Sequence, residues 1–323
     1  MSLRKHWHLL AYDIRCPRRL RRVQKRVARS GQGLQQSVYL VRANPRDLGR
    51  LLAEHNVPAT LLPGRGRGEP VWMGAGLSAS VAPRQAQYAV ATRPHHRLVV
   101  AREQVQAKLA ACRDVLVWRE DEDAALIEQL HRQREALAHC EDMASLLGVE
   151  GTAARHWFAG LQARIPEHWG FQGRNRRPPR DPVNALLSLG YTLLATLAQG
   201  RVEATGLDPW RGFLHEPVAG RPALALDVME AFRPWIDLFV LTLLDTVLGP
   251  EDFTSTESDG CRLNKAARGR FYAAWATWSR SLPGPSDGDG EREPGLAAAL
   301  GRHARALRQR LEAMEAAIGG APF

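Results

Sequence analysis

Two acidic residues, three positions apart in an otherwise apolar segment, are the clearest candidates for chemistry in the sequence. Asp227 and Glu230 lie in segment 224–230, where helical spacing would project both carboxylates from one face. Removing unpaired charges from water costs free energy, so carboxylates in a buried helix need arginine partners, protons or a metal ion. The pair therefore predicts either ion pairs, with arginines such as Arg221 or Arg233, or part of a metal site.

A histidine and a third acidic residue extend this donor set. His215 lies just upstream, in a loop punctuated by Gly and Pro, and Glu150 lies where we expect a helix to begin. One imidazole with two or three carboxylates suits Mn²⁺ or Mg²⁺, with coordination positions left open for a phosphate. Taken singly, Glu150 could simply complement a helix dipole, and His215 could simply cap or hydrogen bond.

A basic loop separates two of these segments. Residues 165–181 are rich in Arg, Gly and Pro and cannot form a continuous helix. The arginines of this loop could hold phosphates and position a nucleic-acid strand, or they could form a solvated surface. They are Arg174, Arg176, Arg177 and Arg180. Tyr191, on the helix that follows, could contact the reacting strand or pack on its own helix.

Positive charge is concentrated at the N-terminus of the 323-residue chain. The formal net charge is +10, yet residues 1–50 hold 13 Lys and Arg against only Asp13 and Asp47. Such asymmetry predicts a polyanionic partner, most simply nucleic acid, through neutralisation of phosphates. The alternative is a basic arm that only raises solubility. The residues expected to follow a phosphate backbone are Arg18, Arg19, Arg22 and Arg26.

Composition excludes several protein classes. With 45% hydrophobic and 24% charged residues the chain is neither disordered nor collagen-like. The four cysteines lie far apart, which indicates neither a disulfide scaffold nor a zinc ribbon and fits a reducing cytoplasm. The most apolar stretch, 235–248, is interrupted by Asp237 and Asp245. We therefore expect a cytoplasmic protein that is not secreted and does not span a membrane.

The elements that must position these residues fall into two parts, which predicts an α+β fold. Residues 1–70 read as a small basic α/β module. Its expected elements are strand 7–14, a basic helix 18–29 ended by Gly31 and Gly33, strand 34–41, helix 45–55, strand 59–62 and a turn or linker at 63–70.

Residues 71–323 read as a mainly helical lobe. A three-or-four spacing of apolar residues predicts an amphipathic helix over 98–116, and Asp121 or Asp123 can cap the next helix. The other expected helices are 126–148, 152–164, 182–199, a buried helix 223–248 bent near Pro234, and 296–318, after a polar linker at 281–295.

Several ordered segments resemble the integrase of CRISPR spacer acquisition, the Cas1 family. They are 101–108, 148–155, 173–191, 206–216, 224–230 and 261–272. By this resemblance Glu150, His215 and Glu230 are metal ligands, and Asp227 is the second acid of its helix. The resemblance also implies a homodimer or higher oligomer that joins short DNA fragments (protospacers) to a CRISPR repeat by transesterification.

The N-terminus departs from that family. Segment 9–14, the basic helix and segment 36–39 resemble the companion protein Cas2, a small ferredoxin-like fold, whereas 47–68 could close the usual Cas1 N-terminal domain. We therefore interpret 1–70 as a fused, shortened or hybrid module, and a separate Cas2-like subunit is a possible partner. Asp13 matches the strand-end aspartate of the companion family, but among so many arginines we expect it to be an ion-pair partner.

Two other functions share these residues. The protein could be a non-catalytic DNA-binding scaffold of an adaptation complex, or a metal-dependent nuclease acting on branched DNA. Water and a DNA hydroxyl would attack the same activated phosphate, so the sequence does not separate hydrolysis from strand transfer. A casposase-like transposase is less favoured, because we find no additional helix-turn-helix near the C-terminus.

Overall fold

The computed structural model divides the chain into two compact units, Met1–Ala79 and Ser80–Phe323, nine residues beyond the boundary expected from the sequence. In the first unit it describes the backbone of five strands. In the second it describes residues 81–119, 123–175, 178–256, 260–282 and 295–319 with their side chains. The expected basic helix, helix 45–55 and most of linker 281–295 lie outside the described residues.

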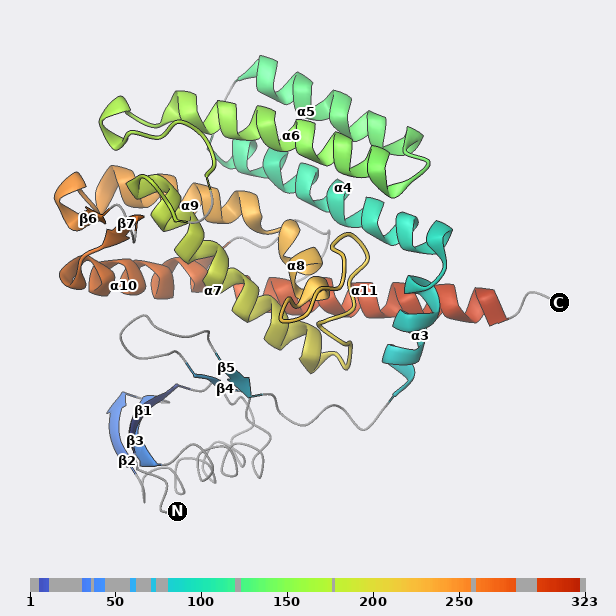
Figure 1. Cartoon of the computed structure of the whole chain (residues 1–323), viewed down its shortest axis with the longest axis horizontal. Helices are drawn as coiled ribbons and strands as arrows, with labels where there is room; N and C mark the ends of the chain where they lie inside the picture. The colour runs from blue at the N-terminus through green and yellow to red at the C-terminus, as the bar shows by residue number, and fades with distance from the viewer. Residues whose placement is uncertain are drawn as a thin grey trace. The chain divides into compact units, whose positions relative to one another are not determined.

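The first unit contains two small antiparallel sheets (Figure 1). β3 (Val38–Ala43) lies between β1 (His6–Ala11) and β2 (Gly31–Gln35) and is antiparallel to both, with Leu9 opposite Leu40. This is the strand arrangement of a split β-α-β unit, as in the first half of a ferredoxin-like fold. The second sheet pairs β4 (Ala59–Leu61) with β5 (Val71–Met73).

The single strand expected at 34–41 is wrong. Gly31 and Gly33 belong to β2, and β2 and β3 lie on either side of residues 36–37 as the two arms of a hairpin. Glycines are ambiguous signals, because they occur both after helices and in irregular strands, and this ladder shifts register between Gly33 and Gln35.

The second unit is mainly helical, so the predicted α+β class is confirmed. Its α-helices are α3 (Ala82–Ala91), α4 (Pro94–Trp118), α5 (Ala124–Ala136), α6 (Met143–Arg164), α7 (Pro182–Ala204), α8 (Ala223–Glu230), α9 (Arg233–Thr246), α10 (Lys265–Ser281) and α11 (Leu296–Gly319). Short 3-10 helices lie at Leu137–His139, Glu167–Trp169 and Pro250–Asp252. No helix in the described residues is long and apolar enough to cross a membrane.

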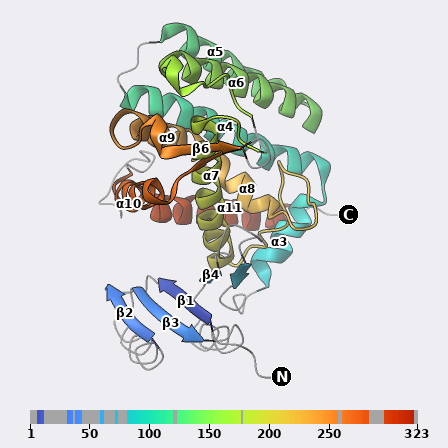
Figure 2. The same ribbon diagram turned by 60° about the vertical axis from the view of Figure 1, so that its left-hand side comes forward.

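These helices pack around α4, α7 and α9 (Figures 1 and 2). α7 contacts α8, α9 and α11, while α5 and α6 form an outer pair against α4. The core is apolar, with side chains such as Leu146, Leu194, Phe213 and Phe239 nearly or fully buried. Burial of this apolar surface fixes α4, α6, α7 and α8 relative to one another, and these elements carry the candidate site.

Side-chain caps define where several of these helices begin. Asp123 accepts a hydrogen bond from Leu126 N at 2.9 Å and caps α5, as the sequence predicts. Asp142 and Ser145 form a capping box that starts α6, which then runs through Gly148. The predicted helix end at Gly148 is therefore wrong, and so is the helix start at Glu150.

The buried helix expected over 223–248 is two helices. α8 ends at Glu230, α9 begins at Arg233, and Pro234 lies in the first turn of α9, where its missing N–H costs no helical hydrogen bond. A break replaces the predicted bend, and as a result Glu230 ends α8 and faces the neighbouring helices.

A β-hairpin that the sequence did not predict supports the arginine-rich loop. β6 (Phe253–Thr256) pairs with β7 (Gly260–Leu263), and Cys261 N donates to Pro179 O at 2.7 Å. Gly260 has φ +69°, and a Cβ there would lie 2.4 Å from Pro179 O. Glycine is required at this contact, which fixes the end of the loop that precedes α7.

Candidate active site

Asp227 is the buried centre of the loop that carries His215. Its side chain is fully buried and accepts three backbone N–H bonds, from Phe213 at 2.5 Å, Leu214 at 3.1 Å and His215 at 2.9 Å. A Cβ on Gly212 would lie 2.9 Å from Asp227 Oδ2, closer than real contacts allow. The loop backbone therefore wraps around this carboxylate.

The same carboxylate orients the His215 ring. His215 Nδ1 lies 2.8 Å from Asp227 Oδ1, so the ring donates from Nδ1 to this carboxylate and Nε2 is directed away from Asp227. His215 Nε2 lies 3.9 Å from Glu230 Oε1. With four donors around its two oxygens, Asp227 has no lone pair left for a metal ion, and its contacts are those of a residue that positions His215.

Two further contacts hold this loop from outside. Gln87 of α3, fully buried, donates from Nε2 to Asp208 O at 2.9 Å and to Arg211 O at 2.6 Å. Arg97 of α4 donates from Nε to Phe213 O at 2.8 Å. The position of His215 is thus set by α3, α4 and α8 together.

Lys108 of α4 joins the two glutamates of the site. Its Nζ hydrogen bonds to Glu150 Oε1 and lies 2.8 Å from Glu230 Oε2. Glu150 lies in the interior of α6, so it does not complement the start of a helix dipole. The structure therefore brings Glu150 and Glu230 to one ammonium group, with His215 near the other oxygen of Glu230 and Asp227 behind the imidazole.

These charges determine protonation at the site. Burial raises the pKa of Glu230, but Lys108, Arg233 and His215 lower it, and the result is a pKa of about 2. Burial lowers the pKa of Lys108, whereas Glu230 and Glu150 raise it above its ordinary value. Near neutral pH the centre is consequently a carboxylate facing an ammonium group.

Sequence reasoning did not identify Lys108. It belongs to the amphipathic stretch of α4, where Gln104 and Cys112 lie four residues before and after it and offer no carboxylate. A mostly buried lysine without an acidic neighbour on its own helix needs one from elsewhere in the fold. That requirement is the signal that could have singled out Lys108.

Tyr191 supports the site from a buried position. Its hydroxyl donates to Asp237 Oδ1, and Trp157 Nε1 donates to Asp237 Oδ2 at 2.7 Å. Burial raises the pKa of Asp237 to about 6 despite these hydrogen bonds. Because the phenol is bonded to Asp237, Tyr191 presents mainly its ring.

Two arginines lie over that ring. Arg233 Cζ is 4.8 Å and Arg174 Cζ is 5.6 Å from the centroid of Tyr191. Arg233 Nε also lies 2.7 Å from Glu230 Oε1, as an ion pair without the alignment of a hydrogen bond. Tyr191 therefore supports a guanidinium that in turn contacts the site.

The arginine-rich loop does not present all of its arginines in the same way. Arg174 donates to Asn184 Oδ1 at 2.6 Å and to Ser188 Oγ at 3.2 Å, which ties it to α7. Arg180 is exposed. Arg176 and Arg177 lie outside the described residues, as do Asp13, Arg18, Arg19, Arg22 and Arg26 of the first unit.

A cavity of about 40 Å³ adjoins the site. Its walls include Lys108, Tyr191, Arg233 and Asp237, so it reaches from the ammonium group to the buried acid. Among the side chains that the structure describes, no three His, Cys, Asp or Glu residues are already arranged around one metal position. The position between the glutamates belongs instead to Lys108.

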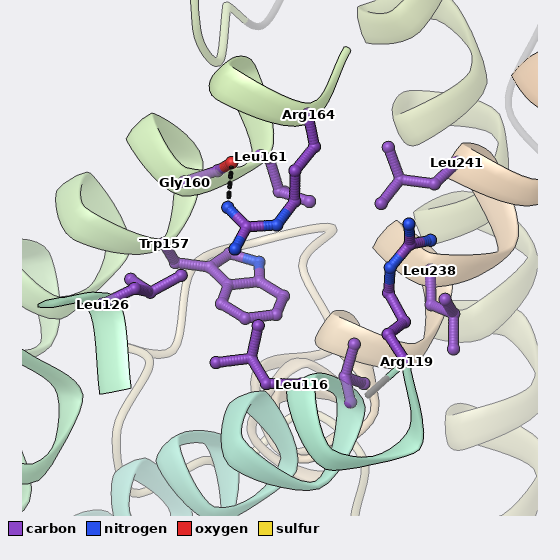
Figure 3. A pocket seen from close by; sticks show the side chains of 10 residues that line it. Leu116, Arg119, Leu126, Trp157, Gly160, Leu161, Arg164, Leu238 and Leu241 are labelled. Carbon is purple, nitrogen blue, oxygen red and sulfur yellow. Dashed lines mark hydrogen bonds between the residues drawn. The ribbon is translucent and has the colours of Figure 1, made fainter. Parts of the chain in front are cut away.

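A second hollow, of about 10 Å³, lies among side chains of α4, α5, α6 and α9. Figure 3 shows it beside Trp157, with Leu116, Leu161 and Leu238 on its walls and Arg164 reaching Gly160 O at 2.6 Å. Its lining is mainly apolar and includes no acidic side chain. None of Lys108, Glu150, His215, Asp227 and Glu230 lines this hollow.

Comparison with known proteins then identifies the family. The family model for CRISPR associated protein Cas1 matches residues 42–277. This chain belongs to the Cas1 family. A second model, for CRISPR associated protein Cas2, matches residues 6–56 and overlaps the Cas1 match at 42–56. The resemblance to both families noted in the sequence is confirmed.

Curated relatives of this Cas1-family chain are named as endonucleases. A CRISPR-associated endonuclease Cas1 of Methanospirillum hungatei is 34% identical over 71% of this chain and 70% of its own length. Another from Thermus thermophilus is 42% identical over 59% of this chain and 57% of its own length. A Cas4/Cas1 fusion from Rhodospirillum rubrum is 40% identical over 61% of this chain and 36% of its own length. This chain thus spans between about a third and three fifths of the last two relatives.

Solved structures share the fold of this Cas1-family chain. A CAS1 protein from Thermotoga maritima matches with a TM-score of 0.71 and 23% identity, over 83% of this chain and 82% of that one. A casposase bound to an integration product matches with a TM-score of 0.70 and 24% identity, over 82% of this chain and 74% of that one. At these identities the likeness concerns the fold.

Proposed function

We propose that this Cas1-family protein is a divalent-metal-dependent DNA integrase and endonuclease of CRISPR adaptation, which inserts short DNA fragments into a repeat array. One observation carries the proposal. Two carboxylates, from Glu150 and Glu230, meet at a single cationic group, and Asp227 directs Nε2 of His215 toward Glu230. A partly buried site with these donors is suited to phosphodiester chemistry.

The donor set fits a hard divalent cation. Two carboxylates and one imidazole nitrogen are ligands that Mn²⁺ and Mg²⁺ accept, and the ammonium of Lys108 marks a position where positive charge is already stabilised. Glu150, His215 and Glu230 would hold the ion. When bound, it would polarise the scissile phosphate and lower the pKa of the attacking 3′-hydroxyl.

The other residues of the site act on position and charge. Asp227 keeps the His215 ring in one orientation, and Arg233 adds positive charge beside Glu230, where a phosphate would approach. Arg180, with Arg176 and Arg177, is the part of the basic loop that contacts the strand backbone. Arg174 and Tyr191 hold this arrangement from behind.

The first unit supplies the platform for the duplex. The Cas2 match and the concentrated charge of residues 1–50 are joined to the same chain as the integrase site. The unit thus supports protospacer and repeat DNA between paired active sites, in a homodimer or higher oligomer, with or without a separate Cas2-like subunit.

An integration assay tests the catalytic assignment. Purified protein is incubated with a short DNA duplex, Mn²⁺ and a supercoiled plasmid that carries a repeat. Glu150→Gln, His215→Ala and Glu230→Gln should each abolish joined products while duplex binding persists, because these residues act on the transferring phosphate. Glu128→Gln, on exposed α5, is the matched control and should join DNA like the wild type.

The products also separate the alternatives. Joined strands demonstrate transesterification, whereas nicks alone indicate hydrolysis. DNA binding by the wild type without joining or cutting would instead favour a non-catalytic scaffold. If all three site variants integrate DNA like the wild type, the assignment of Glu150, His215 and Glu230 as metal ligands is wrong.

A second assay tests the platform. Deletion of residues 1–45, or charge reversal at Arg19, Arg22 and Arg26, should weaken binding of long duplexes and eliminate integration at both repeat ends, while single-end cleavage persists. Paired integration by the truncated chain would contradict the platform. Inactivity of the intact chain until a separate Cas2 is added would reduce the unit to a docking segment.

A further inference from the structure

Lys108 already occupies the position of a cation. Its Nζ contacts one oxygen of Glu150 and one of Glu230, and its side chain is 14% exposed. Without this ammonium group, two carboxylates would face each other in a poorly solvated site, an arrangement that is costly. The lysine therefore satisfies the acid pair in the absence of any ion.

The ammonium group and a divalent ion cannot share this place. Lys108 Nζ lies 2.8 Å from Glu230 Oε2 and hydrogen bonds to Glu150 Oε1, so an ion held by both carboxylates would lie within a few ångström of the ammonium group. Like charges separated by a few ångström in a partly buried site repel each other strongly. Binding an ion to both glutamates therefore requires the ammonium group to move.

The neighbouring cavity has room for the displaced ammonium group. The cavity of about 40 Å³ is lined by Lys108 itself and by Asp237. An ammonium group is about the size of a water molecule, which needs roughly 10–15 Å³ of such space. Each oxygen of Asp237 accepts one hydrogen bond, from Tyr191 or Trp157, and an ionised carboxylate can accept about four.

Lys108 is also the cation of the site best able to move. Its charge lies at the end of a flexible four-carbon stem. Arg233, in contrast, both pairs with Glu230 and stacks on Tyr191. Rotation about the lysine side chain can thus exchange partners without displacing a helix.

We propose that Lys108 is an exchangeable counter-cation, which leaves Glu150 and Glu230 when a divalent ion binds and moves into the cavity toward Asp237. The inference rests on the metal site of the proposed function and specifies how that site is controlled. Lys108 lowers the affinity of the site for the ion. In the metal-free protein it stabilises the fold, because it neutralises the two carboxylates.

Direct Mn²⁺ binding to the metal-stripped full chain tests the exchange. Free Mn²⁺ is measured by electron paramagnetic resonance, and Tm is recorded with and without Mn²⁺. Lys108→Met should bind Mn²⁺ about tenfold or more tightly than the wild type, have a lower Tm without metal, and gain more Tm when Mn²⁺ is added. Lys108→Arg keeps the positive charge and should not bind more tightly than the wild type.

Lys265→Met is the matched control. Lys265 is exposed on α10, so the same chemical change there should leave Mn²⁺ affinity unchanged. A tighter site in both methionine variants would indicate only a general effect of net charge and would overturn the exchange.

Asp237→Asn tests the destination of the lysine. It should weaken Mn²⁺ binding several-fold when Lys108 is present and have no effect in the Lys108→Met background, because only the displaced ammonium needs the acid. Should Lys108→Met fail to fold, this variant decides alone, and unchanged Mn²⁺ affinity in Asp237→Asn overturns the exchange.

The results separate this inference from the metal site itself. If the wild type binds Mn²⁺ and loses it in His215→Ala, while Lys108→Met binds equally or more weakly, the exchange is wrong and the site remains. If neither the wild type nor Lys108→Met binds Mn²⁺, both the metal site and the exchange are wrong.

Discussion

The two acidic residues of α8 are held in different ways. Asp227 is surrounded by three backbone N–H groups and the His215 ring, and the backbone donors cannot leave without unfolding the loop. Glu230 is surrounded by the ends of side chains, from Lys108, Arg233 and His215. The fold thus fixes one carboxylate permanently and leaves the other among partners that can be exchanged.

This difference suggests how such a site is built. A carboxylate whose lone pairs all accept hydrogen bonds within the fold stabilises the structure and has no lone pair left to bind a ligand. A carboxylate satisfied by lysine and arginine can release one partner when a ligand of higher charge arrives. Within three residues of one helix, the chain therefore combines a rigid anchor with an exchangeable ligand.

Asp227→Ala should show the largest effect on stability. It leaves three backbone N–H groups without an acceptor in a fully buried place, so we expect a loss of about 3 to 5 kcal/mol in the free energy of unfolding. Integration should fall and return partly at higher Mn²⁺, because the His215 ring loses its orientation while remaining present. Urea denaturation and the plasmid assay measure the two effects. Unchanged stability would show that Asp227 does not hold the 213–215 loop in place.

Glu230→Gln should cost less stability and should change the pH dependence. The pKa of Glu230 is lowered to about 2 in the folded protein, so its contribution is present above the ordinary pKa near 4.5 and is lost as pH falls toward 2. We expect a loss of up to about 3 kcal/mol at neutral pH, which shrinks below pH 4.5. Denaturation of both proteins between pH 3 and 7 measures this. A difference that is independent of pH would show that the charge of Glu230 does not stabilise the fold.

The arginine-rich loop extends the comparison, with the smallest expected effects. Arg180→Ala should reduce the slope of log affinity against log salt by about one unit, because an exposed arginine loses one phosphate contact. Arg174→Ala should change that slope little and instead lower stability by about 1 to 2 kcal/mol, since its guanidinium is bonded within the fold. Salt titration of DNA binding and urea denaturation distinguish the two. Equal salt slopes in both variants would show that Arg174 and Arg180 do not differ in their contact with DNA phosphates.

The sequence predicts the parts of this structure that depend on local rules. Apolar periodicity is sufficient for α4, α7 and α11, and Asp123 begins α5 as expected. Gly148 misleads, because a glycine can end a helix or pass through one, and a Cβ there would meet nothing within 4 Å. Only packing of the whole of α6 resolves that choice.

For the candidate site, too, local rules predict most of the residues that belong to it but not what each residue contacts. The spacing of Asp227 and Glu230 shows that both belong to one face. The sequence also marks His215 and Glu150 as candidates, and the family resemblance assigns these two as metal ligands together with Glu230. Their different roles depend on which partners surround each oxygen. Lys108 lies 42 residues before Glu150, and no local pattern connects them. Long-range contacts of this kind come only from the fold.

Gly212 shows how a residue without a functional group can be as constrained as a ligand. An added Cβ would lie 2.9 Å from both Ala223 and Asp227 Oδ2, so even alanine would push the loop away from α8. In a library of all single substitutions selected for activity, this position should tolerate as few replacements as Glu150, while exposed Trp210, two residues earlier, accepts many. What position 212 requires is the absence of a side chain, because the loop backbone must lie against α8. A residue with no reactive group can therefore be essential to the site.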